Sequence, residues 1–316
     1  MRLVYFGSGA FGLPTLQALA AAHTVALVVT QPDRPAGRGG RLTPTPVGEW
    51  AEEHAPGVPV LKPERVNAPE VVEQIRGAAA DAWVVIAFGQ KLGRKLLEDR
   101  FAINLHASLL PRWRGAAPIN AAILAGDRVT GNSVITLADR MDAGLVLGRS
   151  ERPIEPSATA GELHDFLAAD GPGLVLRVLA ERGAGSLRGT SQDEALVTLA
   201  PKLSREGAWV DFAATADECR RRINGLSPWP GVLVSLGDLQ LKLLRSQVEA
   251  GAGAGSAAPG TLIDPGAGLV ACGAGVVRLL GVQPVGKRAM SWPEFARGRA
   301  LPPGACLRGD RGGGPC

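Results

Sequence analysis

The chain has 316 residues, of which 46% are hydrophobic, so it is long enough to bury a full core and to form two domains. Its formal net charge of +4 suits a nucleic-acid or phosphate partner but also suits many ordinary enzymes. No apolar run reaches about 18 residues, and the start MRLVYF lacks the pattern of an export signal. We therefore expect a soluble, cytoplasmic protein.

The first half of the chain alternates short β-branched runs with helical patterns. Strands are predicted at residues 3–6, 25–29, 82–88, 101–106 and 133–137, and helices at 14–22, 68–77 and 117–126. The run AWVVIAF is apolar on both faces, as is typical of a central strand with helices on each side. This β-α-β repetition predicts an α/β fold with a doubly wound, mostly parallel sheet.

The second half has a different pattern. A helix pair at 161–185 is expected to close the first domain, and the polar, turn-rich stretch that follows suits a linker. Short strands separated by glycines then predict a small OB-like β-barrel. The expected organisation is a catalytic domain at residues 1–186, a linker at 187–205, a barrel at 206–305 and a disordered tail at 306–316.

Gly7, Gly9 and Gly12 spell G-x-G-x-x-G after the first predicted strand, which is the fingerprint of dinucleotide-binding folds. Such a site usually adds an acidic residue at the end of the second strand. Here that strand is followed by Thr30 and Gln31, which disfavours an NAD site. The glycines otherwise indicate a tight turn packed against the sheet, or a turn beside another ligand.

The stretch FAINLHASLLPRWRGAAPIN, residues 101–120, carries the clearest chemical pattern. Residues two apart on a strand share a face, so Asn104 and His106 project together at the carboxyl end of an internal strand. Open α/β sheets place their active sites at such strand ends. The pair therefore indicates either a catalytic site or a hydrogen-bonded core pair.

The segment NLHASLLPRWRGAAPIN resembles the signature of folate-dependent formyltransferases, and most closely of those that act on methionyl-tRNA. In that family an Asn, a His two residues later and a more distant Asp form the catalytic trio. The resemblance implies Asn104, His106 and Asp142 in these roles. In LADRMDAGLVLG, Asp142 with Gly144 matches the second acid of the family pattern M-D-x-G-x-D-x-G, while Asp139 lies in the preceding loop.

Other segments extend the resemblance to nearly the whole chain. TQPDRPAGRGGRLTPTPV resembles the loop with which the family grips the tRNA acceptor end, and AFGQKLG resembles a segment beside the pterin pocket. The implied folate-binding residues are Phe88, Gly89, Ser108, Leu109, Leu110 and Pro111. The implied tRNA-binding residues are Arg34, Arg38, Arg41, Arg221, Arg245, Lys287 and Arg288, with Arg38 entering the acceptor stem.

The reaction that the resemblance implies is formyl transfer from 10-formyltetrahydrofolate to the α-amine of methionyl-initiator tRNA, with release of tetrahydrofolate. No metal is expected, because an Asn donor and an imidazole can polarise the formyl group, and no metal-ligand spacing occurs in the sequence. The family resemblance also implies a monomer.

Three alternatives remain open at this point. An amino-sugar or purine-precursor formyltransferase would share the trio, but a small amine needs neither the basic loop nor a basic second domain. An NAD-dependent dehydrogenase would use the glycine fingerprint. An RNA-binding module without activity would not need Asn104 and His106 to be intact.

Overall fold

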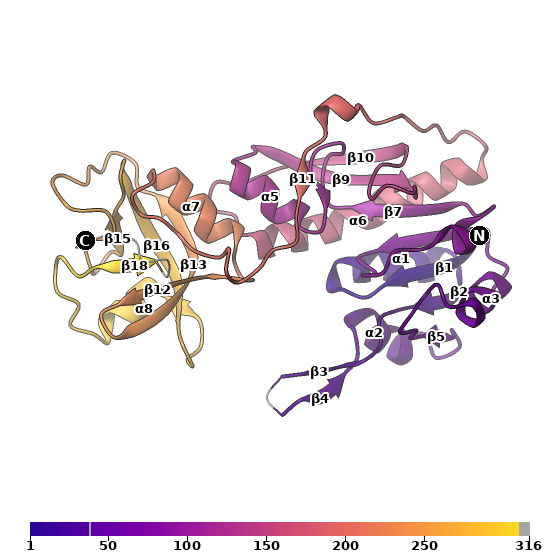
Figure 1. The fold of residues 1–316 in the computed structure, drawn as a ribbon, viewed down its shortest axis with the longest axis horizontal. Helices are drawn as coiled ribbons and strands as arrows, with labels where there is room; N and C mark the ends of the chain where they lie inside the picture. The colour runs from indigo at the N-terminus through magenta and orange to yellow at the C-terminus, as the bar shows by residue number, and fades with distance from the viewer. Residues whose placement is uncertain (38, 310–316) are drawn as a thin grey trace. The chain divides into compact units, whose positions relative to one another are not determined.

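The computed structural model describes residues 1–37 and 39–309 (Figure 1). The chain divides into two compact units, each of which has its own main sheet. The first unit comprises Met1–Gly115, Gly131–Arg152 and His164–Leu199, and the second comprises Ala116–Thr130, Pro153–Leu163 and the chain from Ala200 on.

The first unit contains a seven-stranded sheet in the order β10-β9-β7-β6-β1-β2-β5. Its strands are β1 (Arg2–Gly7), β2 (Thr24–Val29), β5 (Val60–Leu61), β6 (Ala82–Ile86), β7 (Ala102–His106), β9 (Val129–Thr136) and β10 (Val146–Pro153). The pairs from β5 through β7 are parallel and β7 pairs with β9 antiparallel. The predicted doubly wound, mostly parallel sheet is confirmed.

The strand order reverses between β1 and β6. From β1 the chain moves outward through β2 to β5, and it then returns to β6 and β7 on the other side of β1. All five residues of β6 are buried, as its continuous apolar sequence predicts. Ligands of open α/β sheets bind outside the carboxyl ends of the strands at such a reversal. A ligand site is therefore expected at this edge of the sheet.

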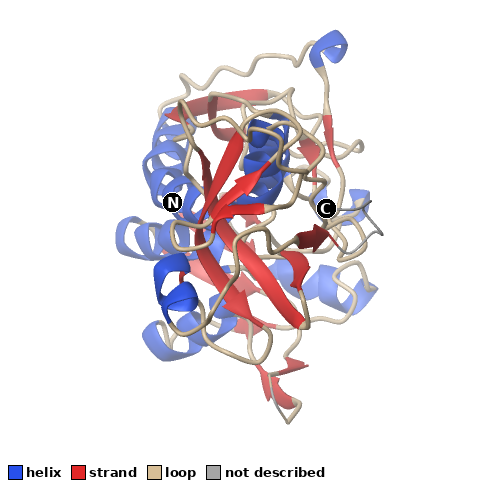
Figure 2. Ribbon diagram, turned by 90° about the vertical axis from the view of Figure 1, so that its left-hand side faces the viewer, coloured by secondary structure: helices blue, strands red, loops and turns tan. Residues whose placement is uncertain are grey.

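Helices cover both faces of this sheet (Figure 1 and Figure 2). They are α1 (Leu13–Ala22), α2 (Pro46–His54), α3 (Pro69–Gly77), α4 (Arg94–Leu97) and α6 (Ala160–Gly183). On one face Val4 and Phe6 of β1 pack with Ile75 of α3 and Leu96 of α4 in one apolar core. Proline lies in the first turn of α1, α2 and α3, where its missing N–H costs no helix hydrogen bond.

The other face of the sheet is covered by α1 and α6. The prediction of a helix pair over 161–185 is wrong, because α6 runs without interruption through Pro172. A methyl group at Gly171 would lie only 2.7 Å from Leu105 of β7 and 2.9 Å from Thr15 of α1. The Gly-Pro sequence that suggested a break therefore lets the helix lie close against the sheet.

The basic segment after β2 forms a hairpin. β3 (Arg34–Ala36) pairs antiparallel with β4 (Arg41–Thr43), and Arg34 lies opposite Thr43. Between the strands, Gly37, Gly39 and Gly40 have positive φ angles, a conformation that residues other than glycine rarely adopt. The glycines that interrupt the arginines in the sequence thus build the turn.

The second unit contains an antiparallel sheet in the order β14-β15-β16-β13-β12-β18, with β17 added to β16. Its strands are β12 (Val232–Leu236), β13 (Leu239–Val248), β14 (Leu262–Asp264), β15 (Leu269–Ala271), β16 (Val276–Pro284), β17 (Met290–Ser291) and β18 (Leu307–Gly309). Helices α5 (Pro118–Ala125), α7 (Ala216–Gly225) and α8 (Trp292–Arg297) belong to the same unit. Trp292 and Phe295 are fully buried in its core.

The sheet of the second unit curls until its two edges meet, which agrees with the predicted barrel. Thr261, next to β14, forms an antiparallel bridge with Cys306, next to β18. The expectation of a disordered tail from residue 306 is wrong for Leu307–Gly309, because these residues form β18 and pair with β12. The rest of the expected tail, 310–316, lies outside the described residues.

The polar segment predicted as a linker is ordered. It contains a short 3-10 helix, Glu194–Leu196, and the strand β11 (Leu199–Ala200), which pairs with β8 (Arg114–Gly115). Its residues up to Leu199 belong to the first unit.

Candidate active site

Asn104 and His106 lie at the carboxyl end of β7, which is held between β6 and β9. The alternation of the strand puts both side chains on one face. His106 is 6% exposed and Asn104 is half-buried. Within the part of the chain that the structure describes, the Asn104 carboxamide forms no hydrogen bond, so its NH2 and its oxygen are available to a ligand.

Both ring nitrogens of His106 face protein atoms. Nε2 lies 2.8 Å from the carbonyl oxygen of Trp113, and Nδ1 lies 3.7 Å from Oδ2 of Asp142. Because a carbonyl oxygen only accepts hydrogen bonds, Nε2 carries a proton in this arrangement. Nδ1 is therefore the ring nitrogen that faces the Asp142 carboxylate.

The turn after β7 fixes the Trp113 carbonyl. Ser133 of β9 donates its hydroxyl to the carbonyl of Ser108 at 2.7 Å and accepts from the Leu110 N–H at 3.1 Å. Ser108 in turn donates to the carbonyl of Arg112 at 2.6 Å. Trp113 itself has φ +63°, which is uncommon for a large residue and indicates that its surroundings impose the conformation.

Asp142 lies in the loop between β9 and β10, and the structure brings it to His106. Its Oδ2 accepts a 2.9 Å hydrogen bond from the N–H of Gly115, and its side chain is 12% exposed. Two residues on, a methyl group at Gly144 would lie 1.7 Å from the carbonyl oxygen of Thr136. Only glycine permits this approach, which brings the loop back along β9.

The residues expected to bind folate lie on two neighbouring strand ends. Phe88 and Gly89 follow β6, and Ser108, Leu109, Leu110 and Pro111 follow β7. The Phe88 ring packs edge-on against Phe6 in the core, and Ser108 and Leu110 are also buried. Any folate contact from these three residues would therefore come from the backbone, whereas Leu109 and Pro111 are only half-buried.

The glycine-rich turn after β1 has a packing role. A methyl group at Gly12 would lie 2.1 Å from Oη of Tyr5, and one at Gly7 would lie 2.9 Å from the carbonyl oxygen of Ile86. Buried Thr30 follows β2 at the place where a ribose-binding acid would be expected. The G-x-G-x-x-G pattern is therefore explained by close packing of this turn against the sheet.

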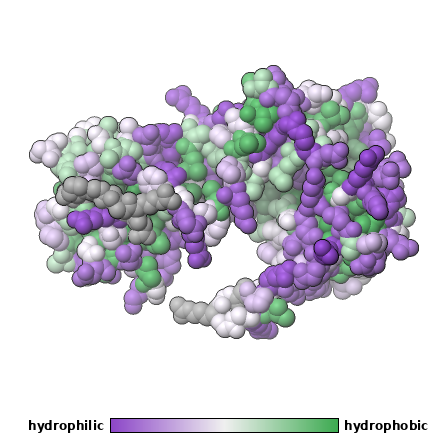
Figure 3. All heavy atoms as spheres, viewed as in Figure 1, coloured by the Kyte–Doolittle hydropathy of each residue, from purple (hydrophilic) through white to green (hydrophobic). Residues whose placement is uncertain are grey.

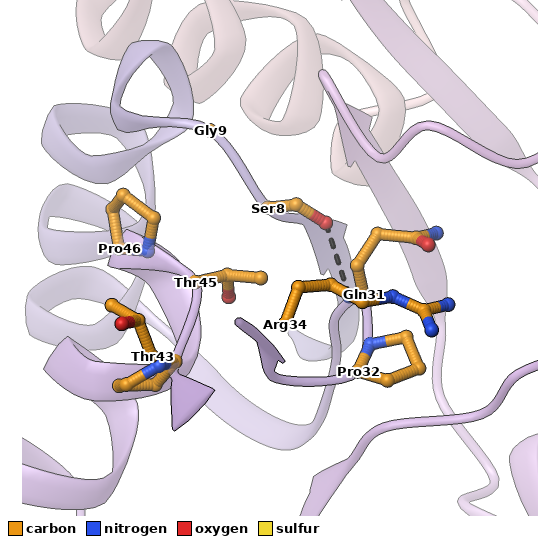
Figure 4. A pocket seen from close by; sticks show the side chains of 9 residues that line it. Ser8, Gly9, Gln31, Pro32, Arg34, Thr43, Thr45 and Pro46 are labelled. Carbon is orange, nitrogen blue, oxygen red and sulfur yellow. Dashed lines mark hydrogen bonds between the residues drawn. The ribbon is translucent and has the colours of Figure 1, made fainter. Parts of the chain in front are cut away.

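A cavity of about 420 Å³ lies between the glycine-rich turn and the basic hairpin (Figure 4). It is lined by Ser8, Gly9, Gln31, Pro32, Arg34, Thr43, Pro44, Thr45 and Pro46. None of these nine residues belongs to the trio. Arg34 is exposed and pairs with Glu64 at 2.6 Å, Arg41 is exposed, and Arg38 lies outside the described residues.

The four basic residues singled out in the barrel differ in their surroundings. Nη2 of Arg245 donates to both carboxylate oxygens of Glu162 at 2.6 and 2.7 Å, and Nε of Arg221 lies 3.0 Å from Oδ2 of Asp217. Lys287 and Arg288 are exposed in the turn after β16. Among the described residues these two form no salt bridge, although the charge of Arg288 still acts on the Glu294 carboxylate and helps to lower its pKa.

Two features were missed by the sequence reasoning. Burial and the nearby charge of Arg205 lower the pKa of the Lys242 ammonium, so the second unit holds a pair of close like charges. In the first unit, Gln192 donates to the carbonyl oxygens of Asp142 and Gly144 at 2.7 and 2.8 Å. Nothing in the polar sequence around Gln192 distinguishes it from a solvated linker residue.

Two kinds of feature are absent from the part of the chain that the structure describes. No helix there is long and apolar enough to cross a membrane, and hydrophilic residues cover much of the face seen in Figure 3. No group of three or more His, Cys, Asp or Glu side chains in those residues is arranged to hold a metal ion.

Comparison with known proteins supplies independent information. The formyl transferase family model matches residues 1–179, and the model for the formyl transferase C-terminal domain matches residues 202–300. The chain is 43% identical over 305 residues to methionyl-tRNA formyltransferase of Methylococcus capsulatus, which covers 95% of this chain and 98% of that protein. It is 42% identical over 314 residues to methionyl-tRNA formyltransferase of Methylobacterium sp., covering 97% of this chain and 99% of that protein.

Solved structures share the fold. An N-formyltransferase from Helicobacter canadensis, in complex with folinic acid and dTDP-3-aminofucose, has a TM-score of 0.67 at 14% identity and covers 90% of this chain and 99% of that one. HypX from Aquifex aeolicus, in complex with tetrahydrofolic acid, has a TM-score of 0.61 at 15% identity and covers 93% of this chain and 46% of that one. With family matches over both parts of its sequence and relatives of nearly the same length, the chain belongs to the formyl transferase family.

Proposed function

We propose that this protein transfers the formyl group of 10-formyltetrahydrofolate to the free α-amino group of methionyl-initiator tRNA. Relatives that match almost from end to end carry the name methionyl-tRNA formyltransferase, which supports the substrate. The observation that carries the chemistry is the His106 ring, held between the Trp113 carbonyl and Asp142, two residues after the available amide of Asn104. The family match argues against the dehydrogenase and against an inactive RNA-binding module.

The reaction forms a bond between the α-amino nitrogen and the formyl carbon and breaks the bond from that carbon to N10 of the folate. A free α-amine has a pKa of about 8, so part of it is protonated at neutral pH. The amine must be neutral when it attacks, and its nitrogen must lose a proton after the new bond has formed. N10 takes up a proton as it leaves. The protein therefore has to stabilise a tetrahedral oxyanion and to move one proton.

Asn104 and His106 divide these tasks. The Asn104 NH2 donates to the oxyanion, and removal of one such donor typically costs about 10²–10³ in kcat. His106 moves the proton, and the Asp142 carboxylate that faces Nδ1 orients the ring. Its Nδ1 contact with Asp142 is longer than a hydrogen bond, so we assign proton exchange to Nδ1 and an anchoring role to Nε2.

The substrates are assigned to the two strand-end regions beside the trio. We place the folate against Phe88 and Gly89 after β6 and against the turn Ser108–Pro111 after β7, as the resemblance implies. We place the tRNA acceptor end on the hairpin with Arg34, Arg38 and Arg41, where guanidinium groups pair with phosphates and stack on unpaired bases.

In this proposal residues 1–186 carry catalysis and residues 206–305 bind the body of the tRNA. Lys287 and Arg288 are the principal phosphate contacts of the barrel, whereas Arg221 and Arg245 contribute less because each already forms a direct salt bridge with a carboxylate. The protein acts as a cytoplasmic monomer, a state that light scattering at working concentration checks.

One experiment tests the substrate. The purified full chain is mixed with 10-formyltetrahydrofolate labelled in the formyl group and with methionine-charged initiator tRNA, or with a dTDP-linked amino sugar in a parallel reaction. We expect label on the charged tRNA and none on the sugar. Label on the sugar alone would assign the protein to the small-amine formyltransferases.

A further inference from the structure

The segment from Thr190 to Thr198, here called the bridging segment, touches every support of the His106 ring. Thr190 pairs with Val146 of β10 through two hydrogen bonds of 2.9 Å. Gln192 contacts the loop that carries Asp142, and Thr198 contacts the turn that carries the Trp113 carbonyl. The sequence predicts a linker here, and no group of the bridging segment takes part in the proposed reaction.

We propose that Gln192 is a positioning residue for formyl transfer, which acts through both groups that hold the His106 ring. The proposal rests on the function proposed above. Gln192 itself is half-buried, and among the described residues it forms no hydrogen bond with His106 or Asn104. It belongs to the support of the imidazole and not to the reacting groups.

The Gln192 carboxamide joins two loops. Its Nε2 donates to the carbonyl oxygens of Asp142 and Gly144 at 2.7 and 2.8 Å. Its Oε1 accepts from Nε and Nη2 of Arg114 at 3.0 and 2.9 Å. Both hydrogens of the amide and both acceptor sites of its oxygen are used, so the orientation of the amide is fixed by its partners.

Arg114 carries this connection to the turn after β7. Its side chain is 4% exposed and its charge is paired with Glu194 at 2.9 Å. Its backbone N–H donates to the carbonyl of Thr198 at 2.9 Å, and the N–H of Trp113 donates to the Thr198 hydroxyl at 2.9 Å. The turn is thus held from outside while the Trp113 carbonyl points to the histidine.

The two chains of contacts meet at His106. One runs from Gln192 through the Asp142 backbone to the carboxylate that faces Nδ1, and the other runs through Arg114 and Trp113 to Nε2. Asp142 and Trp113 both have positive φ angles, so each depends on its surroundings to keep its conformation. Loss of the amide would release both supports together and let the ring turn.

The test uses Gln192→Ala and Gln192→Glu in the full chain. Gln192→Glu keeps the shape of the side chain but places a negatively charged oxygen against the carbonyl oxygens of Asp142 and Gly144. We expect kcat for formyl transfer to fall by about tenfold to hundredfold in both variants, as misplacement of a catalytic group does, with less than a twofold change in either KM. The matched control is Ser191→Ala, because Ser191 is exposed and next to Gln192. It is expected to keep the wild-type kcat.

Two further measurements separate positioning from simple stability. In the His106→Ala background, Gln192→Ala should cause no additional loss of kcat, because its effect passes through the ring. The ¹⁵N NMR signature of the His106 ring should show the proton on Nε2 in the wild type and a mixture of both tautomers in Gln192→Ala. A lower melting temperature with wild-type kcat and an unchanged ring signature would overturn the proposal.

The ring signature does not depend on any substrate. If the wild-type protein fails to formylate methionyl-tRNA but Gln192→Ala still changes the His106 tautomer, the proposed function fails and the positioning role stands. If the wild type is active and neither kcat nor the signature responds to Gln192→Ala, the positioning role alone fails.

Discussion

The turn after β7 and the hairpin after β2 both place arginines beyond the carboxyl end of a strand, yet they use them differently. Arg114 is 4% exposed and is surrounded by Gln192 and Glu194, which it holds against the loop of Asp142. Arg34 and Arg41 are exposed on a two-stranded hairpin. Arg114 is buried among its polar partners, whereas Arg34 and Arg41 keep their side chains at the surface, Arg34 in a pair with the exposed Glu64.

The comparison shows that residue type alone does not separate a structural cation from a binding one. Burial does, because Arg34 and Arg114 both have a carboxylate partner and only Arg114 is buried. The following predictions test this difference, from the reacting groups of the strand end to the basic residues of the barrel.

The largest effect is expected for His106→Ala and Asn104→Ala. Each should lower kcat for formylation by about 10²-fold or more, because each removes charge or a donor that stabilises the transition state. Steady-state assays with labelled formyl donor measure the loss. His54→Ala, at an exposed histidine of α2, is the control and should keep the wild-type rate. Wild-type turnover in either strand variant would refute the assignment.

Asp142→Asn should come next. The amide oxygen can still accept from the Gly115 N–H, so the loop keeps its shape, but the charge that faces His106 is lost. We expect kcat to fall by about tenfold to hundredfold while folate binding, followed by fluorescence titration, stays unchanged. Normal kcat at all pH values would mean that the carboxylate has no role beyond the loop.

Arg41→Ala and Arg34→Ala should weaken the use of tRNA by about tenfold each, with KM for the folate unchanged. The salt dependence of kcat/KM for tRNA should become shallower by about one unit per lost phosphate contact. Glu64→Gln is an informative companion, because it removes the carboxylate that opposes Arg34. That variant should use tRNA at least as well as the wild type, and a loss would place Arg34 among the structural arginines.

In the barrel, Lys287→Ala and Arg288→Ala should raise KM for tRNA a few-fold in a salt-dependent way, whereas Arg245→Ala should change KM less. A larger effect of Arg245→Ala than of the other two would contradict the distinction drawn from ion pairing.

The smallest effect concerns stability in acid. Burial alone would raise the pKa of the Glu162 carboxyl, but hydrogen bonds from Thr159 and the charge and hydrogen bonds of Arg245 lower it overall. A lowered pKa adds stability above the unfolded value of about 4.3, and this stability is lost as the pH falls through the folded value. The melting temperature of Arg245→Met should therefore fall less between about pH 5 and pH 3 than that of the wild type. An unchanged slope would mean that the pair is neutral to stability.

Much of the fold could be predicted because local sequence and final packing agree. The apolar run of β6 is buried on both faces, and the alternation in β7 places Asn104 and His106 together. The single helix α6 was missed because Pro172 suggests a break, and only the contact of Gly171 with Leu105 explains its continuity. β18 was missed because its pairing partner lies far away in sequence.

The site was predictable in its chemistry but not in its support. Spacing and resemblance select Asn104, His106 and Asp142, and the structure brings the last two side by side, although their roles stay predictions. Gln192 could not be found, because its hydrogen bonds join loops about 50 and 80 residues away along the chain. The paired state of Arg245 depends likewise on a glutamate 83 residues away.

The most direct test of the catalytic assignment is a double-mutant cycle of His106→Ala and Asp142→Asn, with single-turnover formyl transfer to charged initiator tRNA as the readout. If Asp142 acts through the imidazole, the double variant should be no slower than His106→Ala alone. Independent, multiplying losses would contradict the account, because the carboxylate would then serve the reaction without the ring.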